Sequence, residues 1–317
     1  MTTSENLDEQ MVSIIIPTFN RAYIIQKTLP SYLNSKCVGE VIIVADGVTD
    51  CTHDVINEFK DRPKNCDLRL LIHDQKMGAA AARLTGLNNA KYQYIMFGED
   101  DVYIEDDYPT KLLKRLLNKN LGFVSGRIIY LLKNESLHDA KKRFNFGLNN
   151  KPLLDKKFFR INQEKYLPKD CETVFSHALY MSEKSTLQTL GFDQFYRKGT
   201  GYREETDAQV RGFFVNKKHM IAHDAFCFHM NFEDVPSGGQ RLPKIQHWYW
   251  NIILNNYFFK INISEINKHS LMDFKSTFLI NLIFIVNQTN LFFIRPYYIS
   301  IRSKIFAVIK RYILRRT

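Results

Sequence analysis

The sequence predicts an α/β fold in which helices flank a Rossmann-like, mostly parallel sheet. Over the first 130 residues, short apolar runs alternate with segments whose apolar positions recur every three or four residues. This alternation is typical of parallel strands that are joined by crossover helices. Polar clusters also follow several of the apolar runs directly, and a parallel sheet binds ligands at the carboxyl ends of its strands. Together, the two observations predict one open sheet with a site along that edge.

Turn residues and local composition indicate where the strands and helices of the first 130 residues begin and end. The run at 12–16 is rich in β-branched residues, which favour strands, and it stops at Pro17. The segment at 79–90 is rich in alanine, the residue that best suits a helix. We expect strands at 12–16, 41–44, 68–72 and 94–97, and helices at 24–33, 50–59 and 79–90.

The second part of the chain is less regular. Residues 133–170 are charged and aromatic with weak periodicity, which is typical of a binding or lid segment. Pro236 to Gly239 give the clearest linker signal, so we expect one domain at 11–235 and a helical, basic C-terminal extension at 236–317. Within 107–229 we expect helices at 107–117, 184–190 and 204–214, and strands at 121–132, 177–181 and 220–229.

An acidic segment follows the fourth expected strand. Glu99, Asp100 and Asp101 are consecutive, so their negative charges repel one another. A hard divalent cation such as Mg²⁺ or Mn²⁺ offsets that repulsion, because it prefers oxygen ligands. An acidic turn exposed to water is the alternative. Polar residues after the first two strands, Thr18 and Asp46 among them, converge on the same edge, which favours a ligand site.

Composition and charge restrict the class of protein. Apolar residues make up 45% of the chain, which excludes general disorder. The five cysteines form no CxxC pair and no apolar signal segment follows Met1, so we expect a cytoplasmic protein with reduced thiols. The net charge of +11 is concentrated near the C-terminus, because no acid follows Asp273. A nearly neutral body with a basic tail indicates contact with an anionic surface and argues against binding of nucleic acid.

The tail has the pattern of a basic helix that lies on a membrane surface. Its longest apolar run, 278–286, is interrupted by Asn281 and is shorter than the roughly 20 residues that span a membrane. We therefore expect the tail to hold the protein at the inner face of the cell membrane without crossing it; packing of the apolar stripe against protein is the alternative. The stripe is formed by Tyr298, Ile301, Ile305, Ile309 and Tyr312, and the basic residues around it are Arg302, Lys304, Lys310, Arg311, Arg315 and Arg316.

The order of the motifs resembles that of the family 2 inverting glycosyltransferases, which have the GT-A fold. The resemblance covers about residues 11–231, and five motifs in the family's order carry it. Ala45, Val48, Leu84 and Gly98 depart from the family's pattern. The motifs are the opening strand and loop at 12–21, Val44-Ala45-Asp46-Gly47-Val48-Thr49-Asp50, the helix start at 78–86, the acidic segment at 99–101, and Gly201-Tyr202-Arg203-Glu204-Glu205-Thr206-Asp207 followed by Arg211.

The resemblance implies a cation site, Mn²⁺ or Mg²⁺, in the acidic segment. Gly98 stands where the family usually has the first aspartate, and in this alignment Asp100 is the first choice as direct metal ligand. Asp101 is the next choice, and Glu99 is expected to face the sugar or the ribose. His229 falls where many relatives place a histidine near the metal and the diphosphate; a polar residue packed at a strand end is the alternative.

The resemblance also implies a nucleotide site and a catalytic base. Asp46 can accept a hydrogen bond from a base N–H, and Arg83 can reach a base or a phosphate. Glu205 is the expected base that activates the acceptor hydroxyl, with Glu204 as the second choice. Asp207 and Arg211 lie four positions apart on the expected helix and should form an ion pair. The expected nucleotide contacts are Pro17, Thr18, Asn20, Arg21, Asp46, Arg83, Glu99 and Asp100.

The resulting expectation is a metal-dependent, inverting glycosyltransferase of cell-surface polysaccharide synthesis. It would move a sugar from a nucleoside diphosphate sugar, expected to be a UDP-sugar, to a hydroxyl of a glycan or a lipid-linked acceptor. The chain has no GxGxxG motif after its first strand, which argues against an NAD-dependent enzyme. A nucleotidyltransferase should have a Gly-rich basic loop there, which is also absent. A catalytically impaired scaffold of the same fold, or a protein that only binds a membrane surface, is the alternative.

Overall fold

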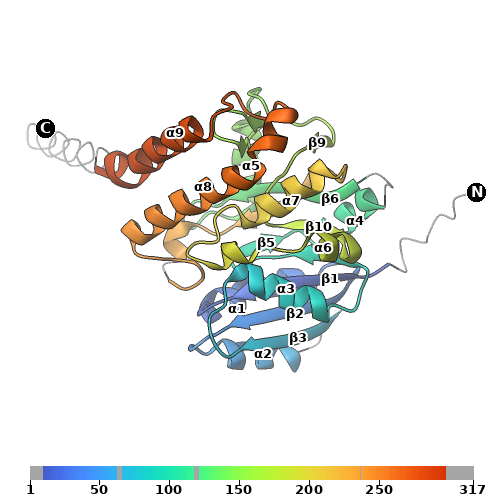
Figure 1. The fold of residues 1–317 in the computed structure, drawn as a ribbon. Helices are drawn as coiled ribbons and strands as arrows, with labels where there is room; N and C mark the ends of the chain where they lie inside the picture. Colours follow the sequence, from blue (N-terminus) through green and yellow to red (C-terminus); the bar gives the residue numbers. More distant parts are fainter. Residues whose placement is uncertain (1–9, 63–65, 118–120, 236, 298–317) are drawn as a thin grey trace, which may run out of the picture. The chain divides into compact units, whose positions relative to one another are not determined.

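The computed structural model describes residues 10–62, 66–117, 121–235 and 237–297, and its main body is an α/β fold (Figure 1). The strands of the main sheet are β1 (Val12–Thr18), β2 (Val38–Asp46), β3 (Asp67–His73), β4 (Tyr94–Phe97), β5 (Val102–Ile104), β6 (Leu121–Tyr130), β9 (Cys171–Thr173), β10 (Tyr180–Glu183) and β11 (Lys218–His229). Their order is β3-β2-β1-β4-β10-β6-β11-β5, with β9 paired to β11. Strands β3, β2, β1, β4, β6 and β11 run in one direction, and β10, β5 and β9 run in the other. The predicted fold class is confirmed.

Helices cover both faces of this sheet. Successive side chains of a strand point to opposite faces, so each face has apolar side chains for helices to cover. Ile14 and Ile16 of β1 pack in one core cluster, whereas Ile15 packs in another. The first cluster includes residues of α1 (Ala22–Leu33), α2 (Thr52–Lys60) and α4 (Tyr108–Leu116), and the second includes residues of α3 (Ala79–Asn89), α6 (Lys184–Leu190) and α7 (Glu204–Phe214). The helices predicted from periodicity in this region are confirmed to within a few residues at their ends.

The segment 133–170, expected to be irregular, contains one helix and a small sheet. Helix α5 (Leu137–Phe146) begins at Ser136, whose hydroxyl accepts a hydrogen bond from Asp139 N. Ala140 and Phe144 of α5 pack against Ile129 of β6 and Phe228 of β11. The short strands β7 (Leu154–Asp155) and β8 (Arg160–Ile161) pair with each other. Helix α5 therefore shares an ordered apolar cluster with β6 and β11, on one side of that strand pair.

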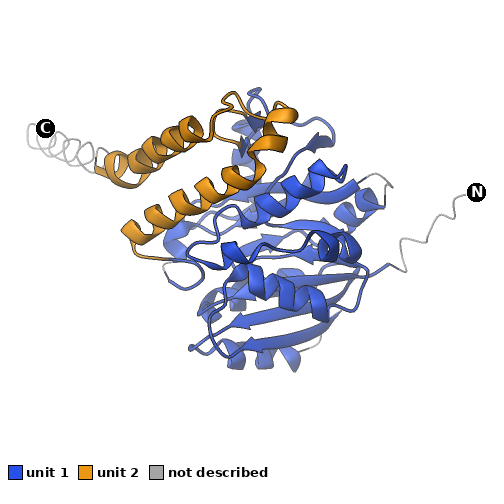
Figure 2. Cartoon of the chain, viewed as in Figure 1, with its two compact units in different colours: residues 1–155, 160–241 blue, residues 156–159, 242–317 orange. Residues whose placement is uncertain are grey.

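The chain divides into two compact units, which Figure 2 shows in separate colours: residues 1–155 with 160–241, and residues 156–159 with 242–317. In the second unit, α8 (Lys244–Lys268) packs against α9 (Thr277–Thr289), which continues as a π-helical turn at Asn290–Ile294. The Phe159 ring contacts the rings of Phe258 and Phe259 of α8, at centroid distances of 5.7 and 5.9 Å. Buried side chains of α9, such as Ile280 and Phe284, form its packed face.

The helix that includes α9 is longer than the sequence pattern indicated. One continuous helix, Thr277–Tyr297, has 21 residues and is long and apolar enough to cross a membrane by length and composition. The apolar run at 278–286 ends in the sequence before Asn287, but the helix continues through the polar residues 287–290. Phe278, Leu282 and Val286 are exposed along it (78%, 45% and 62%). The predicted apolar stripe from Tyr298 to Tyr312 lies outside the described residues.

Candidate active site

The first helix holds the acidic loop between β4 and β5 in place. The Tyr32 hydroxyl donates to Glu99 O at 3.0 Å and accepts from Glu99 N at 3.3 Å, and the Thr28 hydroxyl donates to Asp100 O at 2.7 Å. A Cβ atom on Gly98 would lie 2.9 Å from Ile16 Cγ1 and 3.1 Å from the Tyr32 ring. Position 98 is therefore too crowded for the aspartate that the family usually has there, and the acidic side chains begin at Glu99.

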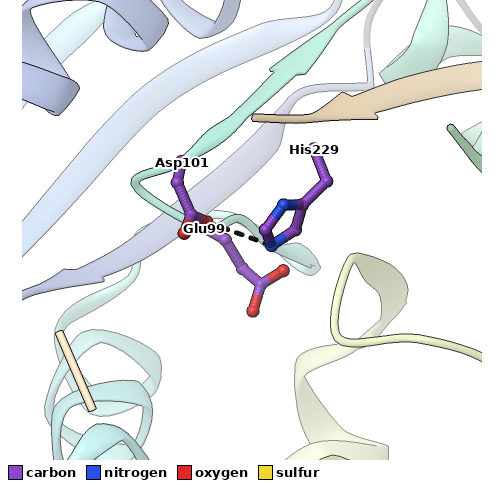
Figure 3. Close-up of side chains that lie close together, drawn as sticks. All are labelled: Glu99, Asp101 and His229. Atoms are coloured by element: carbon purple, nitrogen blue, oxygen red, sulfur yellow. Dashed lines mark ion pairs between the residues drawn. The ribbon is translucent and has the colours of Figure 1, made fainter. Parts of the chain in front are cut away.

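Glu99 and Asp101 meet His229, at the end of β11, in a cluster that could hold a cation (Figure 3). Each residue offers a ligand atom, and these atoms lie within 4.8 Å of one another. His229 Nε2 lies 3.6 Å from Asp101 Oδ1. His229 Nδ1 lies 2.8 Å from Met230 O, and since a carbonyl only accepts, this nitrogen must donate. That hydrogen bond leaves Nε2 of the neutral ring unprotonated and directed at the carboxylates, as in many histidines that bind metals.

Asp100, the expected direct metal ligand, has both of its oxygens engaged by protein groups. Thr18 Oγ1 donates to Asp100 Oδ2 at 2.8 Å, and Arg21 Nη1 donates to Asp100 Oδ1 at 2.7 Å. The same Arg21 nitrogen donates to Asp101 Oδ2 at 2.9 Å. Arg21 is itself buried, and the two aspartates raise its pKa against the opposing effect of burial. In the structure Asp100 ties the β1–α1 loop to the acidic loop, and Glu99 takes part in the cluster with Asp101 and His229; the expected role of Asp100 as first metal ligand stays a prediction.

The two glutamates at the start of α7 lie in different surroundings. Glu204 is buried and accepts two hydrogen bonds from Arg83 Nη1, at 2.8 and 2.9 Å. Arg83 Nη2 also lies 3.9 Å from Glu99 Oε1, so this guanidinium joins the two acidic clusters. Glu205 lines the cavity and makes no hydrogen bond or ion pair with the described part of the chain. Further along α7, the expected pair of Asp207 and Arg211 is confirmed at 2.8 Å.

Asp46 holds a loop at the edge of the cavity. Its Oδ1 accepts from Met77 N at 2.8 Å and lies 2.7 Å from His73 Nδ1, and its Oδ2 accepts from Gly78 N at 2.8 Å. Only one acceptor position, on Oδ2, remains for a ligand. Asn20, by contrast, lies outside the cavity lining: it has a positive φ of 52°, and its side chain exchanges hydrogen bonds with Thr49 N and Oγ1. Of the expected nucleotide contacts, Asn20 is the one that the structure does not bring into the cavity.

These side chains surround a cavity of about 330 Å³. It also contains residues that were not among the expected site residues, above all Lys76 and Phe19. The Lys76 ammonium lies 3.9 Å from the centre of the Phe19 ring and donates to Gly239 O at 3.0 Å. Burial lowers the pKa of Lys76, and the nearby Asp46 opposes that shift. The expected site residues in the lining are Pro17, Thr18, Arg21, Asp46, Arg83, Glu99, Asp100, Asp101, Glu204, Glu205 and His229.

A second group of possible ligands, Asp170, His223 and Asp224, has a different character. Arg115 donates to Asp170 at 2.7 and 3.0 Å and to Asp224 at 2.7 Å, and His223 Nδ1 lies 2.8 Å from Asp170 Oδ1. Although partial burial opposes the shift, hydrogen bonds from Arg115 and His223 lower the pKa of Asp170 to about 2. An arginine already compensates these charges, so the group is a structural ion-pair network.

Comparisons with known proteins agree with this fold. The sequence model of "Glycosyl transferase family 2" matches residues 13–183, more than half of the chain. The protein named glycosyltransferase GlyA of Streptococcus pneumoniae is 32% identical over 132 residues, which cover 41% of this chain and 18% of that protein. Poly-beta-1,6-N-acetyl-D-glucosamine synthase of Staphylococcus epidermidis is 32% identical over 128 residues, covering 40% of this chain and 30% of that enzyme. The matched segment is thus less than a third of either relative.

Solved structures share the fold at low sequence identity. The crystal structure of S. aureus TarS residues 1–349 in complex with UDP-GlcNAc has a TM-score of 0.56 and 13% identity, and the match covers 89% of this chain and 73% of that one. The mannosyltransferase PcManGT from Pyrobaculum calidifontis, in complex with GDP-Man and Mn²⁺, has a TM-score of 0.54 and 16% identity, with 88% and 70% coverage. At these identities the likeness concerns the fold.

Proposed function

Because the chain belongs to the family 2 glycosyltransferases, we propose that it transfers a sugar from a nucleoside diphosphate sugar to an acceptor hydroxyl, with a divalent cation and with inversion at the anomeric carbon. The observation that carries this proposal is that the Glu99–Asp101–His229 cluster lies in the same cavity as Glu205, whose carboxylate has no ion pair among the described residues. We assign the transfer to residues 11–235. The neighbours that bind UDP-GlcNAc and GDP-Man support a nucleotide sugar as donor, and a UDP-sugar is our first choice.

Glu99, Asp101 and His229 would hold the cation. Two carboxylates and one imidazole suit Mn²⁺ better than Mg²⁺, because Mg²⁺ prefers oxygen ligands alone. Asp101 Oδ1 is free for this role, since Arg21 takes the other oxygen. Burial, followed by the charge of Asp101, raises the pKa of Glu99 to about 7, so the apo site resists a full set of negative charges. When bound, the cation supplies Lewis-acid stabilisation of the negative charge on the departing diphosphate.

Glu205 would accept the proton of the acceptor hydroxyl. Its carboxylate lines the cavity and makes no ion pair with the described residues, whereas Glu204 is fully engaged by Arg83. Glu204 would then act indirectly, because it fixes the Arg83 guanidinium beside Glu99. Arg83, Lys76 and the loop that contains Pro17 and Thr18 would position the nucleotide and its phosphates.

We place the acceptor on a glycan or on a lipid carrier of cell-surface polysaccharide synthesis. Support comes from the relative named as a poly-N-acetylglucosamine synthase and from the C-terminal extension, 236–317. Helix Thr277–Tyr297 exposes apolar side chains, and eight basic residues with no acid follow Asp273. This combination suits an anionic membrane surface, and we place the protein at the cytoplasmic face of the cell membrane as a peripheral protein.

A panel of nucleotide sugars tests the proposal directly. The purified protein should release nucleoside diphosphate slowly from one donor when Mn²⁺ is present, and EDTA should stop the release. NMR of a transferred product should show the anomeric configuration opposite to that of the donor. Retention of configuration would contradict the single-displacement mechanism. A protein that binds Mn²⁺ and a donor but never releases diphosphate would instead be the impaired scaffold.

A further inference from the structure

Tyr130 lies beside the candidate cation cluster with more than half of its surface exposed (55%). It is the last residue of β6 and pairs in register with His229 of β11, so both side chains project from the same face of the sheet. The two rings are in contact, with centroids 5.2 Å apart and planes inclined by 40°. An exposed aromatic ring therefore adjoins one of the proposed ligands of the cation.

Packing of the sheet does not explain an aromatic residue at this position. The other nine residues of β6, Leu121 to Ile129, are all buried, and Tyr130 alone is exposed. The neighbouring Ile129 and Phe228 project from the opposite face, where they pack against α5. The Tyr130 side chain thus reaches solvent on the side of the sheet that carries the acidic cluster.

Tyr130 is connected to the cavity of the proposed base through His229, because its ring contacts the His229 ring and His229 lines the same cavity as Glu205. In an inverting displacement the acceptor hydroxyl must approach the anomeric carbon from the side opposite the diphosphate, next to the base. An acceptor sugar that stacks on the exposed Tyr130 ring would lie beside His229, one of the residues that line this cavity.

We propose that Tyr130 forms an acceptor subsite in which the pyranose ring of a sugar stacks on the tyrosine ring. One face of a pyranose presents C–H groups, which are apolar and slightly positive, and the face of an aromatic ring is slightly negative. Stacking fixes the plane of the acceptor sugar and directs one hydroxyl towards Glu205. The inference rests on the proposed function and narrows it: the group that accepts the transferred sugar is itself a sugar hydroxyl.

The test uses saturation-transfer NMR with methyl β-glycosides of glucose, galactose and N-acetylglucosamine, and it requires no turnover. With the wild-type protein, UDP and Mg²⁺, which is diamagnetic and does not broaden the sugar signals as Mn²⁺ would, we expect saturation of C–H protons on one face of at least one of these sugars. The signal should persist in Tyr130→Phe, which keeps the ring face, and disappear in Tyr130→Ala. Phe146→Ala is the matched control, because Phe146 is a highly exposed ring (92%) on α5, against the other face of the strands.

Kinetics give a second readout with the sugar that binds. Tyr130→Ala should raise the KM for that acceptor about tenfold, the change that a loss of about 1.4 kcal/mol produces, and should shift the donor KM much less. An acceptor KM and an NMR signal unchanged in Tyr130→Ala would overturn the subsite but not the proposed function. Absence of diphosphate release from every donor in the wild-type protein would overturn the proposed function first.

Discussion

Arg83 Nη1 donates to both carboxylate oxygens of Glu204, at 2.8 and 2.9 Å, in the lining of the cavity, and both side chains are almost fully buried. Removing one charge from a buried pair is strongly destabilising, because the other charge is left without compensation. Glu204→Gln should therefore lower the free energy of unfolding by about 3 kcal/mol. Urea denaturation measures this value. Loss of activity in this variant, with its fold weakened, would not identify Glu204 as the base.

Glu205→Gln should have the opposite profile. The neutral isostere keeps the shape of the side chain, and Glu205 makes no ion pair with the described residues, so stability should change little. Turnover should fall by roughly two to four orders of magnitude, the usual effect of removing a general base. Steady-state kinetics at saturating donor, together with the urea midpoint, separate the two glutamates. Normal turnover in Glu205→Gln would assign the base elsewhere.

The cation cluster predicts which acid controls metal affinity. Asp101→Asn and His229→Gln should each weaken Mn²⁺ binding roughly tenfold or more in the presence of UDP, measured by calorimetry. Asp100→Asn should weaken it less, because the Asp100 oxygens are engaged by Thr18 and Arg21. Its larger effect should be on the urea midpoint, since Arg21 loses part of its charge compensation. If Asp100→Asn were the variant that abolishes Mn²⁺ binding, the ligand order expected from sequence would be the correct one.

This contrast explains how far the sequence could predict the site. Alternating strands and helices determine which edge collects the polar residues, so eleven of the twelve expected site residues line one cavity. The direction of each acidic side chain depends instead on contacts that are distant along the chain. Gly98 fits against Ile16 and Tyr32, and Arg21 reaches Asp100 across 79 positions. Lys76 was not predicted as a site residue, because its position depends on the hydrogen bonds that Asp46 accepts from Met77 N and Gly78 N. No local sequence pattern indicates these hydrogen bonds.

Two buried histidines predict a loss of stability in mild acid. Burial lowers the pKa of His177 to about 4 and that of His219 to about 3, from the usual value of 6.5. Below about pH 6.5 the unfolded chain binds protons that the folded protein cannot, so stability falls as the pH drops from 6.5 towards 4. Each histidine contributes at most about 1.4 kcal/mol per pH unit.

Urea midpoints at about pH 7.5 and pH 5 measure this effect. The difference between the two midpoints should be smaller in His219→Gln than in the wild type, because glutamine does not titrate. A matched control is His138→Gln, since His138 is an exposed side chain (76%). An equal pH dependence in His219→Gln and the wild type would show that this histidine is not the acid-sensitive group.

Finally, the exposed face of α9 predicts reversible binding to anionic membranes. Phe278, Leu282 and Val286 recur every four residues and are exposed, while Ile280 and Phe284 occupy the packed face. The basic residues that follow in the sequence should each add about 1 kcal/mol near anionic lipid. Binding should therefore increase with the anionic lipid content of vesicles and decrease with salt in sedimentation assays. The triple substitution Phe278→Ser, Leu282→Ser and Val286→Ser should weaken it at least tenfold, the effect of losing about 1.4 kcal/mol.

The matched control for this experiment is Ile72→Ser, which removes an exposed apolar side chain (55%) from β3. It should bind vesicles like the wild type. If binding does not depend on the anionic lipid content or on the salt concentration, the basic residues do not face the membrane. No binding at all, together with a dimer of the full chain that the triple substitution dissociates, would instead identify the exposed face of α9 as a contact between two copies, and the placement at the membrane would lose its main support.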